Sequence, residues 1–313
     1  MDNFKISTIC AIDSKDYETI DALNKAIRWT HKMKQEDYYN QFFPRKDLFT
    51  NQFIEFKSPE YYMSNLFNGR ATMNSYLRDK NVDEIKDIVV KLLRMRIETK
   101  GIRQAPGELE SKTITFPAIS ALLKRGINYH ALCRFAGAEC RYDYKSKIGI
   151  HPSHQFDLII DSREQKPLNF KSDNVKTKIQ KLEYGDYEDV NSIHPLTVER
   201  KSLNDYIGTL SRDYERFSRE CARAREDGFG LVVLVESDLA KATSFNYSRG
   251  NFSKCDPKFV FSKMRDILRE YPNVQFLFVD GREEAARVML NLFGALETPM
   301  MFDLQYLYNT EQI

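Results

Sequence analysis

Charged residues in the second half of the chain stand where short apolar runs end. In "LTVERKSLND", Glu199 and Lys201 are two residues apart in a predicted strand. Because successive side chains of a strand point to opposite faces, these two lie on one face and Arg200 lies on the other. Asp161 follows the apolar run "FDLII", and Asp186 stands in the predicted turn "YGDY". The pattern predicts that carboxylates from three elements meet a lysine at one sheet edge.

This set of residue types is suited to metal-assisted hydrolysis of a phosphodiester. Carboxylate oxygens are the ligands that Mg²⁺ prefers. A bound cation neutralises charge on the phosphate and lowers the pKa of a coordinated water. A lysine beside it stabilises developing negative charge. Solvated surface charge is the alternative for any one cluster, but it explains less well a D…GD…ExK series that occurs in order.

The elements that must position these residues begin at Phe156. Four apolar runs predict strands: "FDLII", "LTVER", "GLVVLVE" and "VQFLFVD". Helical patterns lie between or after them at 205–226, 256–270 and 282–292. Alternating strands and helices are typical of an α/β domain, and we expect a mixed or largely parallel central sheet flanked by helices.

The first half of the chain is predicted to be mainly helical. Amphipathic patterns occur in "TIDALNKAIRWTHKM" and "VDEIKDIVVKLLRMRIE". Residues 116–137 are similar to a helix-turn-helix with its turn at Gly126, a pattern that any helical hairpin also produces. We expect apolar residues such as Phe135 to pack inward. Four polar or aromatic residues are expected to face outward: Asn128, Tyr129, His130 and Arg134. These patterns divide the chain into a helical, DNA-binding domain at 1–140, a linker at 141–155 and a catalytic domain at 156–313.

Two groups of basic residues are candidates for contacts with DNA phosphates. Residues 100–149 hold nine Lys and Arg against four Asp and Glu, in a chain whose net charge is only +2. A local basic patch of this kind suits phosphate contacts, although solvated surface is the commoner explanation. In "TLSRDYERFSRECARAREDG", arginines recur at helical spacing opposite an apolar stripe; the bland alternative is a solvated face partly paired with Glu215 and Glu220. The candidate DNA contacts are Lys124, Arg125, Arg134, Arg212, Arg216, Arg219 and Arg223.

Together, "DSREQKP", "YGDY" and "VERKSLND" resemble the XPF-type nuclease domain, with its GD…ERKxxxD signature, over residues 156–296. That family belongs to the PD-(D/E)XK superfamily of restriction-endonuclease-like folds. The resemblance implies a DNA endonuclease dependent on Mg²⁺ or Mn²⁺ that prefers branched DNA and often dimerises through this domain. It assigns metal binding to Asp161, Asp186 and Glu199, and water activation to Lys201. It assigns support of the site or DNA contact to Arg163, Glu164, Arg200 and Asp205.

One departure from the family bears on the substrate. Eukaryotic members carry a tandem helix-hairpin-helix module after the nuclease domain, and only about 20 residues follow the last predicted helix here. We therefore expect the N-terminal half to select the DNA, as in a compact phage or mobile-element nuclease for DNA processing, recombination or repair. A sequence-specific homing or restriction-type endonuclease is an alternative. A non-catalytic DNA-binding scaffold is another, against which the intact acidic set argues.

Composition excludes several other classes of protein. The chain is 42% hydrophobic and 29% charged, which is typical of a globular protein. It has no apolar run long enough to span a membrane, and its first residues lack the pattern of a secretory signal. Five scattered cysteines without a CxxC pair favour a reducing compartment and argue against a structural zinc site. We expect a cytoplasmic protein, or a nuclear one in a eukaryote.

Overall fold

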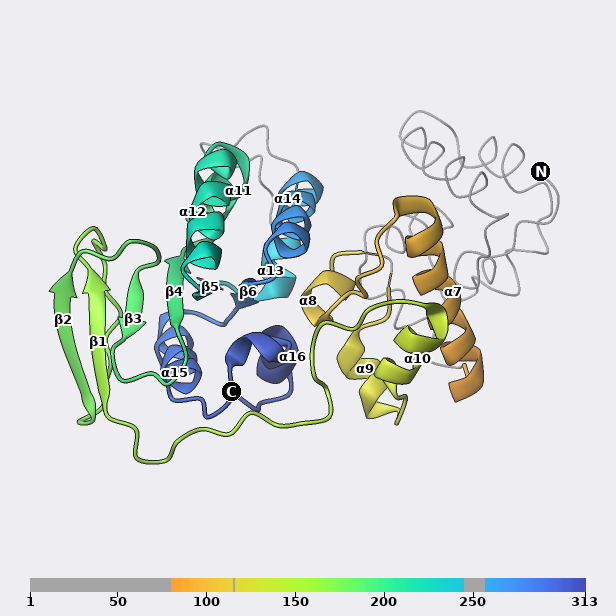
Figure 1. Ribbon diagram of the computed structural model, residues 1–313, viewed down its shortest axis with the longest axis horizontal. Coiled ribbons are helices and arrows are strands. Elements are labelled where there is room, and N and C mark those ends of the chain that lie inside the picture. Colours follow the sequence, from red (N-terminus) through yellow and green to blue (C-terminus); the bar gives the residue numbers. More distant parts are fainter. Residues whose placement is uncertain (1–79, 115, 245–256) are drawn as a thin grey trace. The chain divides into compact units, whose positions relative to one another are not determined.

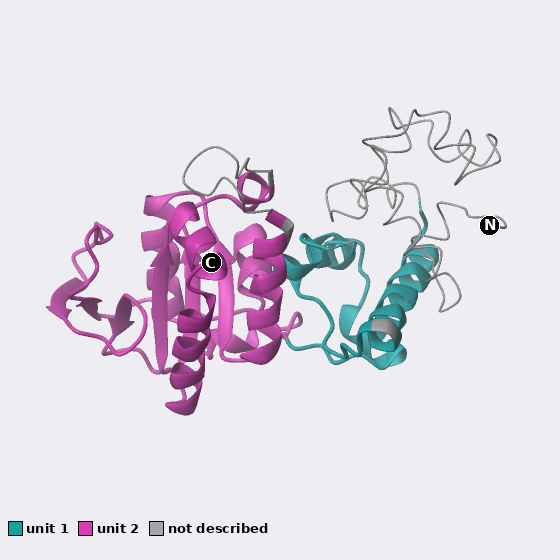
Figure 2. Cartoon of the chain, turned by 90° about the horizontal axis from the view of Figure 1, so that it is seen from above, with its two compact units in different colours: residues 1–141 teal, residues 142–313 magenta. Residues whose placement is uncertain are grey.

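The computed structural model describes residues 80–114, 116–244 and 257–313. The helix expected within "TIDALNKAIRWTHKM" lies outside these residues. The chain divides into two compact units, residues 1–141 and 142–313, coloured separately in Figure 2. In the described residues no helix is long and apolar enough to cross a membrane.

Unit 2 is built on a six-stranded mixed sheet with the order β2-β1-β3-β4-β5-β6. Its strands are β1 (Phe156–Asp161), β2 (Val175–Gln180), β3 (Tyr187–Asp189), β4 (Leu196–Lys201), β5 (Gly230–Val235) and β6 (Val274–Phe278). β2 and β1 are parallel, β3 is antiparallel to both β1 and β4, and β4, β5 and β6 are parallel. The predicted mixed sheet flanked by helices is confirmed.

Helices pack on both faces of the sheet (Figure 1). They are α11 (Leu203–Ser211), α12 (Tyr214–Glu226), α13 (Leu239–Ser244), α14 (Pro257–Glu270), α15 (Arg282–Phe293) and α16 (Leu304–Asn309), with a 3₁₀ turn at Pro299–Met301. α11 lies against β4 and α12 against β5. On the other face, Val198 of β4 and Leu158 of β1 share a buried core with residues of α15 such as Val288. This arrangement leaves β4 near the middle of the unit with a helical layer on each side.

The helix predicted over 205–226 is wrong as a single element. Arg212 caps the C-terminus of α11 and Asp213 caps the N-terminus of α12. The hydroxyl of Ser211 donates to the carbonyl of Ile207 at 2.6 Å. This kind of bond back to the preceding turn bends helices, and it stands where α11 ends. Arg212 therefore does not share a helix with the arginines that follow it.

Unit 1, in its described part, is helical. Its helices are α7 (Val82–Lys100), α8 (Glu108–Ser111), α9 (Ile119–Lys124) and α10 (Tyr129–Ala136). The side chain of Asn81 accepts from the backbone N–H of Glu84, and the carboxylate of Glu84 accepts from the backbone N–H of Asn81, so α7 begins with a capping box. The turn between α9 and α10 contains Gly126 at φ +73°. The helix-turn-helix-like backbone is thus present, while its use in DNA binding stays a prediction.

Two orientations expected for the second helix of this hairpin are wrong. Tyr129 is only 1% exposed, because its hydroxyl donates to the carbonyl of Pro106 and its ring packs edge-on against Phe116. Phe135 is 70% exposed and lies under the guanidinium of Arg94, with its ring centroid 5.2 Å away. The buried stripe of α10 is formed by Tyr129, Leu132, Cys133 and Ala136, and Phe135 lies outside it.

Residues 142–155 run along unit 2 without a helix or a long strand. The backbone of Asp143 donates to Met301, and that of His151 donates to Gly294. Ile148 belongs to the buried core beneath β4. This segment is therefore packed onto the sheet domain along its length.

Candidate active site

The two faces of β4 carry different chemistry. Glu199 is buried, and its carboxylate contacts the ammonium of Lys201 on the same face. Arg200 points to the opposite face, as its ion pairs with Glu164 and Glu236 show. Burial alone would lower the pKa of Lys201, but the carboxylate of Glu199 outweighs it and the net shift is upward. The predicted separation of Glu199 and Lys201 from Arg200 is confirmed, and Lys201 is a cation.

Gly185 sets the conformation of the turn that carries Asp186. Its φ is +71°, in the left-handed region, and a Cβ atom there would lie 2.0 Å from Oγ1 of Thr197. That hydroxyl lies against the turn because it donates to the carbonyls of Tyr184 and Tyr187. Both the dihedral angle and the space therefore require glycine. From this turn, Asp186 enters the sheet, and its N–H donates to Val198 at 2.9 Å.

The carboxylate of Asp186 is placed against β4. Its Oδ2 accepts from the backbone N–H of Arg200 at 2.8 Å. Burial raises the pKa of Asp186 to about 8, the charge of Glu199 adds to the effect, and Lys201 opposes it. Asp186 and Glu199 thus form a pair of interacting carboxylates beside one ammonium. A cation bound between such carboxylates would relieve their repulsion.

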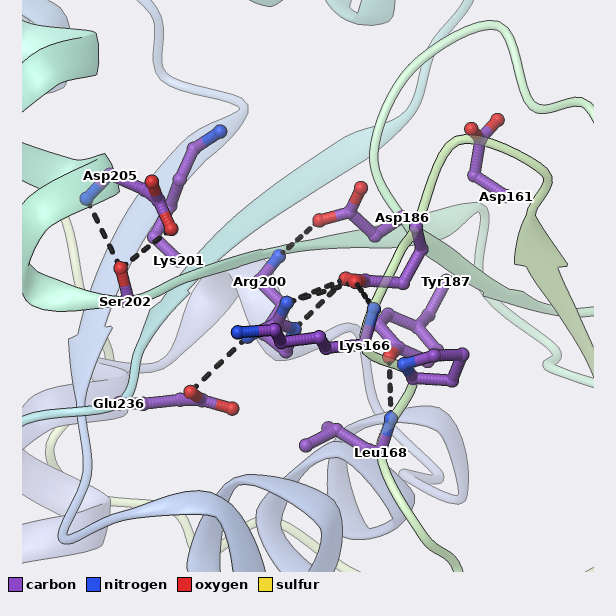
Figure 3. A network of polar contacts seen from close by, with 12 residues as sticks. Asp161, Lys166, Leu168, Asp186, Tyr187, Arg200, Lys201, Ser202, Asp205 and Glu236 are labelled. Carbon is purple, nitrogen blue, oxygen red and sulfur yellow. Dashed lines mark hydrogen bonds and ion pairs between the residues drawn. The ribbon is translucent and has the colours of Figure 1, made fainter.

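Asp161 stands at the end of β1 with both carboxylate oxygens engaged. Oδ1 accepts from the N–H and Nε of Arg163, each at 2.7 Å, and Oδ2 accepts from the N–H of Leu182 at 2.6 Å. Burial alone would raise the pKa of Asp161, but these hydrogen bonds lower it. In Figure 3 its carboxylate points away from Arg200 and Glu236. The structure therefore uses Asp161 to fix the chain after β1 and β2, and its role as a metal ligand stays a prediction.

Arg200 is the centre of a chain of alternating charges that is buried at Arg200, Glu164 and Glu236 (Figure 3). Its guanidinium donates to both oxygens of Glu164 at 2.9 Å and lies 3.2 Å from Glu236. Glu236 also pairs with Arg282 at 3.1 Å, and Arg282 donates onward to the carbonyl of Pro167. The network ties the loop after β1, the end of β5 and the start of α15 to β4. Support of the site or contact with DNA by Arg200 and Glu164 stays a prediction.

Asp205 takes part in the cap of α11. The hydroxyl of Ser202 accepts from the N–H of Asp205 at 3.2 Å and donates to its carboxylate at 2.6 Å. Only Ser202 separates the strand, which ends at Lys201, from the helix, which begins at Leu203. The aspartate of the ERKxxxD pattern therefore has a local structural explanation.

Glu220 of α12 also reaches this site, and sequence reasoning treated it only as a surface partner of arginine. Its Oε1 accepts from the N–H of Gly185 at 3.2 Å. Burial raises the pKa of Glu220, and the charge of Glu199 adds to the effect. Glu220 directly precedes the buried Cys221, so it lies beside the apolar stripe of α12. That position was the available signal, but the contact joins residues 35 apart in sequence.

The candidate DNA contacts lie on the surface of both units. Arg216, Arg219 and Arg223 are exposed on α12, and Arg212 is exposed at the end of α11. Arg223 lies 3.9 Å from Glu183 in the turn that precedes Asp186. In unit 1, all three candidates are exposed: Lys124, Arg125 and Arg134.

A divalent cation fits the donors of this site only in one way. Among residues 80–114, 116–244 and 257–313, no group of three or more His, Cys, Asp or Glu side chains is arranged to hold a metal ion. Asp186 and Glu199 offer two carboxylates. Mg²⁺ is commonly bound in proteins through one or two carboxylates, with water and substrate phosphate as its other ligands. The donor set therefore suits a cation that is completed by the substrate.

Comparisons with known proteins find similarity in the part of the chain that carries this site. The family model described as the ERCC4 domain matches residues 160–292, which confirms the predicted XPF-type nuclease domain. Two solved structures of XPF from Aeropyrum pernix are similar, one of them in complex with DNA. They are 20% and 18% identical, both with a TM-score of 0.34, and the matches cover 44% and 43% of this chain. The matches span 63% and 58% of those chains. A search of curated proteins finds no match.

Proposed function

We propose that this chain, which carries an ERCC4 domain at residues 160–292, is a DNA endonuclease that depends on a divalent cation and acts on branched DNA. The observation that supports the proposal most directly is the convergence of Asp186 and Glu199 beside the ammonium of Lys201. These are the residue types that phosphodiester hydrolysis requires. Glu199 and Lys201 lie on β4, and Asp186 directly precedes β3, the strand that pairs with β4.

In this proposal Asp186 and Glu199 hold the cation, with Mg²⁺ or Mn²⁺ as the candidates. When bound, the cation would neutralise phosphate charge and lower the pKa of a coordinated water. The backbone N–H of Arg200 holds the carboxylate of Asp186 in position. The buried ion pair between Arg200 and Glu164 fixes the strand from its other face. Asp161 is retained as a further candidate ligand only if DNA or metal displaces Arg163 from it.

Lys201 orients the attacking water and stabilises charge on the phosphate. Its contact with Glu199 keeps the ammonium protonated and holds it on the site face. Attack in line on phosphorus then leaves a 5′-phosphate and a 3′-hydroxyl. This outcome is the one that the family resemblance implies.

DNA is held in the proposal by exposed basic residues. Arg216, Arg219 and Arg223 project from α12, the helix that also supplies Glu220 to the site. Lys124, Arg125 and Arg134 in unit 1 are the proposed contacts that help to select the substrate. Dimerisation through the nuclease domain and an origin in a phage or mobile element remain predictions.

The decisive experiment is a nicking assay on supercoiled plasmid and on a labelled forked duplex, with Mg²⁺, with Mn²⁺ and with EDTA. Wild-type protein is expected to cut only when metal is present. Asp186→Asn and Lys201→Ala are each expected to abolish cleavage while DNA binding, measured by fluorescence anisotropy, is retained. Asp238→Asn changes an exposed acid outside the site and serves as the control for loss of a charge. Cleavage at the wild-type rate by either site variant would show that the site is wrongly assigned.

The choice of substrate separates the two nuclease hypotheses. Cutting a fork or flap in preference to linear duplex supports structure-specific action. Fixed fragments from a large plasmid, with no preference for the fork, would instead indicate a sequence-specific homing or restriction-type enzyme. Binding without any metal-dependent cleavage would favour the scaffold hypothesis.

A further inference from the structure

Glu220 connects α12 to the turn that carries Asp186. The N–H of Gly185, the residue directly before Asp186, donates to Oε1 of Glu220 at 3.2 Å. Gly185 is buried, so this N–H has no access to bulk water if the acceptor is removed. The bond therefore controls a buried backbone group one residue from a proposed metal ligand.

Two further contacts join the same turn to α12 and the residues after it. Tyr184 packs edge-on against Phe229, with ring centroids 5.2 Å apart. Arg223 lies 3.9 Å from Glu183 at the surface. Neither contact reaches Gly185 or Asp186. Of these three contacts, the bond between Glu220 and Gly185 is thus the nearest in sequence to Asp186.

We propose that Glu220 is a positioning residue, which holds the Gly185–Asp186 turn so that the carboxylate of Asp186 faces Glu199 and Lys201. The inference rests on the proposed nuclease function and extends it to a residue outside the D…GD…ERK series. It also gives α12 two roles, since the same helix presents Arg216 and Arg219 to solvent. The helix whose exposed arginines are the proposed DNA contacts thereby also sets the position of the site turn.

The contact can be separated from the charge by a conservative substitution. Glu220→Gln keeps an oxygen that can accept from Gly185 but removes the negative charge. Glu220→Ala removes both. A positioning role requires that the glutamine variant retain function and that the alanine variant lose it, whereas a role for the charge near Lys201 requires that both lose it.

The test is steady-state cleavage of a labelled forked duplex in MgCl₂ by the full-length chain. Glu220→Ala is expected to lower kcat by about 10-fold to 100-fold, as is typical when a residue that orients a metal ligand is lost. KM should stay within about twofold, because ground-state DNA binding is unchanged. Glu220→Gln should retain kcat within about threefold of wild type. Glu226→Ala, an exposed acid at the end of α12, is the matched control and should behave as wild type.

Equal losses in Glu220→Gln and Glu220→Ala would overturn the proposal, and so would wild-type kcat in Glu220→Ala. A second readout does not depend on cleavage. The amide of Gly185 should exchange with solvent deuterium faster in Glu220→Ala than in wild type or Glu220→Gln. If the wild-type protein cuts no DNA, the proposed function fails; if it cuts but Gly185 exchange is the same in all three proteins, the positioning role fails.

Discussion

Replacing Arg200 by methionine should destabilise unit 2 rather than act on the chemistry directly. The side chains of Arg200, Glu164 and Glu236 are 10%, 5% and 9% exposed in their ion pairs. Removing one partner of a buried pair costs about 3–5 kcal/mol, because an uncompensated charge stays buried. Glu236 keeps Arg282, and Glu164 keeps a bond from the N–H of Lys166 at 2.7 Å. We therefore expect the lower end of that range, about 3 kcal/mol.

A double-mutant cycle isolates the pair. Arg200→Met and Glu164→Leu are each expected to destabilise, while the double variant should be less destabilised than the sum of the two. The coupling energy is expected to be about 1–3 kcal/mol. The stability effect also has a pH dependence. The arginine lowers the pKa of Glu164 below its ordinary value of 4.5, so the stabilisation is present above that pH and is lost as the pH falls through the folded-state value.

The assay follows urea unfolding of the full-length chain by thiol labelling, with the label on Cys221 quantified by mass spectrometry of its peptide. This cysteine is buried in unit 2, so its labelling reports that unit alone. A destabilisation below about 1 kcal/mol for Arg200→Met, the value typical of surface pairs, would refute the reasoning. If Arg200→Met is as stable as wild type but no longer binds DNA, the role of Arg200 is to contact the substrate.

Three other changes test separate parts of the site. Gly185→Ala should abolish cleavage and lower the Tm, because its Cβ would meet Thr197 in a left-handed turn; wild-type cleavage would contradict this. Asp161→Asn should cost about 1.5–3 kcal/mol in urea unfolding, since it weakens charge-assisted hydrogen bonds that are buried, and an unchanged midpoint would refute the structural role. Arg216→Ala and Arg219→Ala should each reduce the slope of log K against log salt by about 0.9, and unchanged slopes would remove these residues from the DNA contacts.

The sequence was sufficient for those parts of the site that follow from strand geometry. The alternation of side chains along "VERK" separates Arg200 from its neighbours, and its ion pair with Glu164, against that of Lys201 with Glu199, confirms the separation. The turn at Gly185 was also predictable, because glycine and aspartate are both typical turn residues. The approach of Asp186 to β4 required the antiparallel pairing of β3, a strand of only three residues that no periodicity indicates.

Other features depended on tertiary contacts that local patterns do not encode. β2 was missed for another reason: its sequence "VKTKIQ" alternates β-branched with polar residues, which is a strand pattern, although the strand is exposed along nearly its whole length. The contact of Glu220 with Gly185 joins two elements that are separated by β3, β4 and α11. The break before α12 stands beside a hydroxyl bond from Ser211 to Ile207, which the apolar spacing of the predicted helix does not indicate.

β4 leads directly into α11, so residues 196–211 form a continuous strand, cap and helix without a loop. Lys201 ends the strand and Ser202 caps the helix, so no loop separates the ammonium from regular structure on either side. The backbone at Lys201 is therefore fixed by a sheet ladder before it and a helix cap after it. Substitutions of Lys201 therefore change the length or basicity of the side chain while the backbone stays constant. Differences in rate among such variants would then report the chemistry of the side chain rather than a rearranged loop.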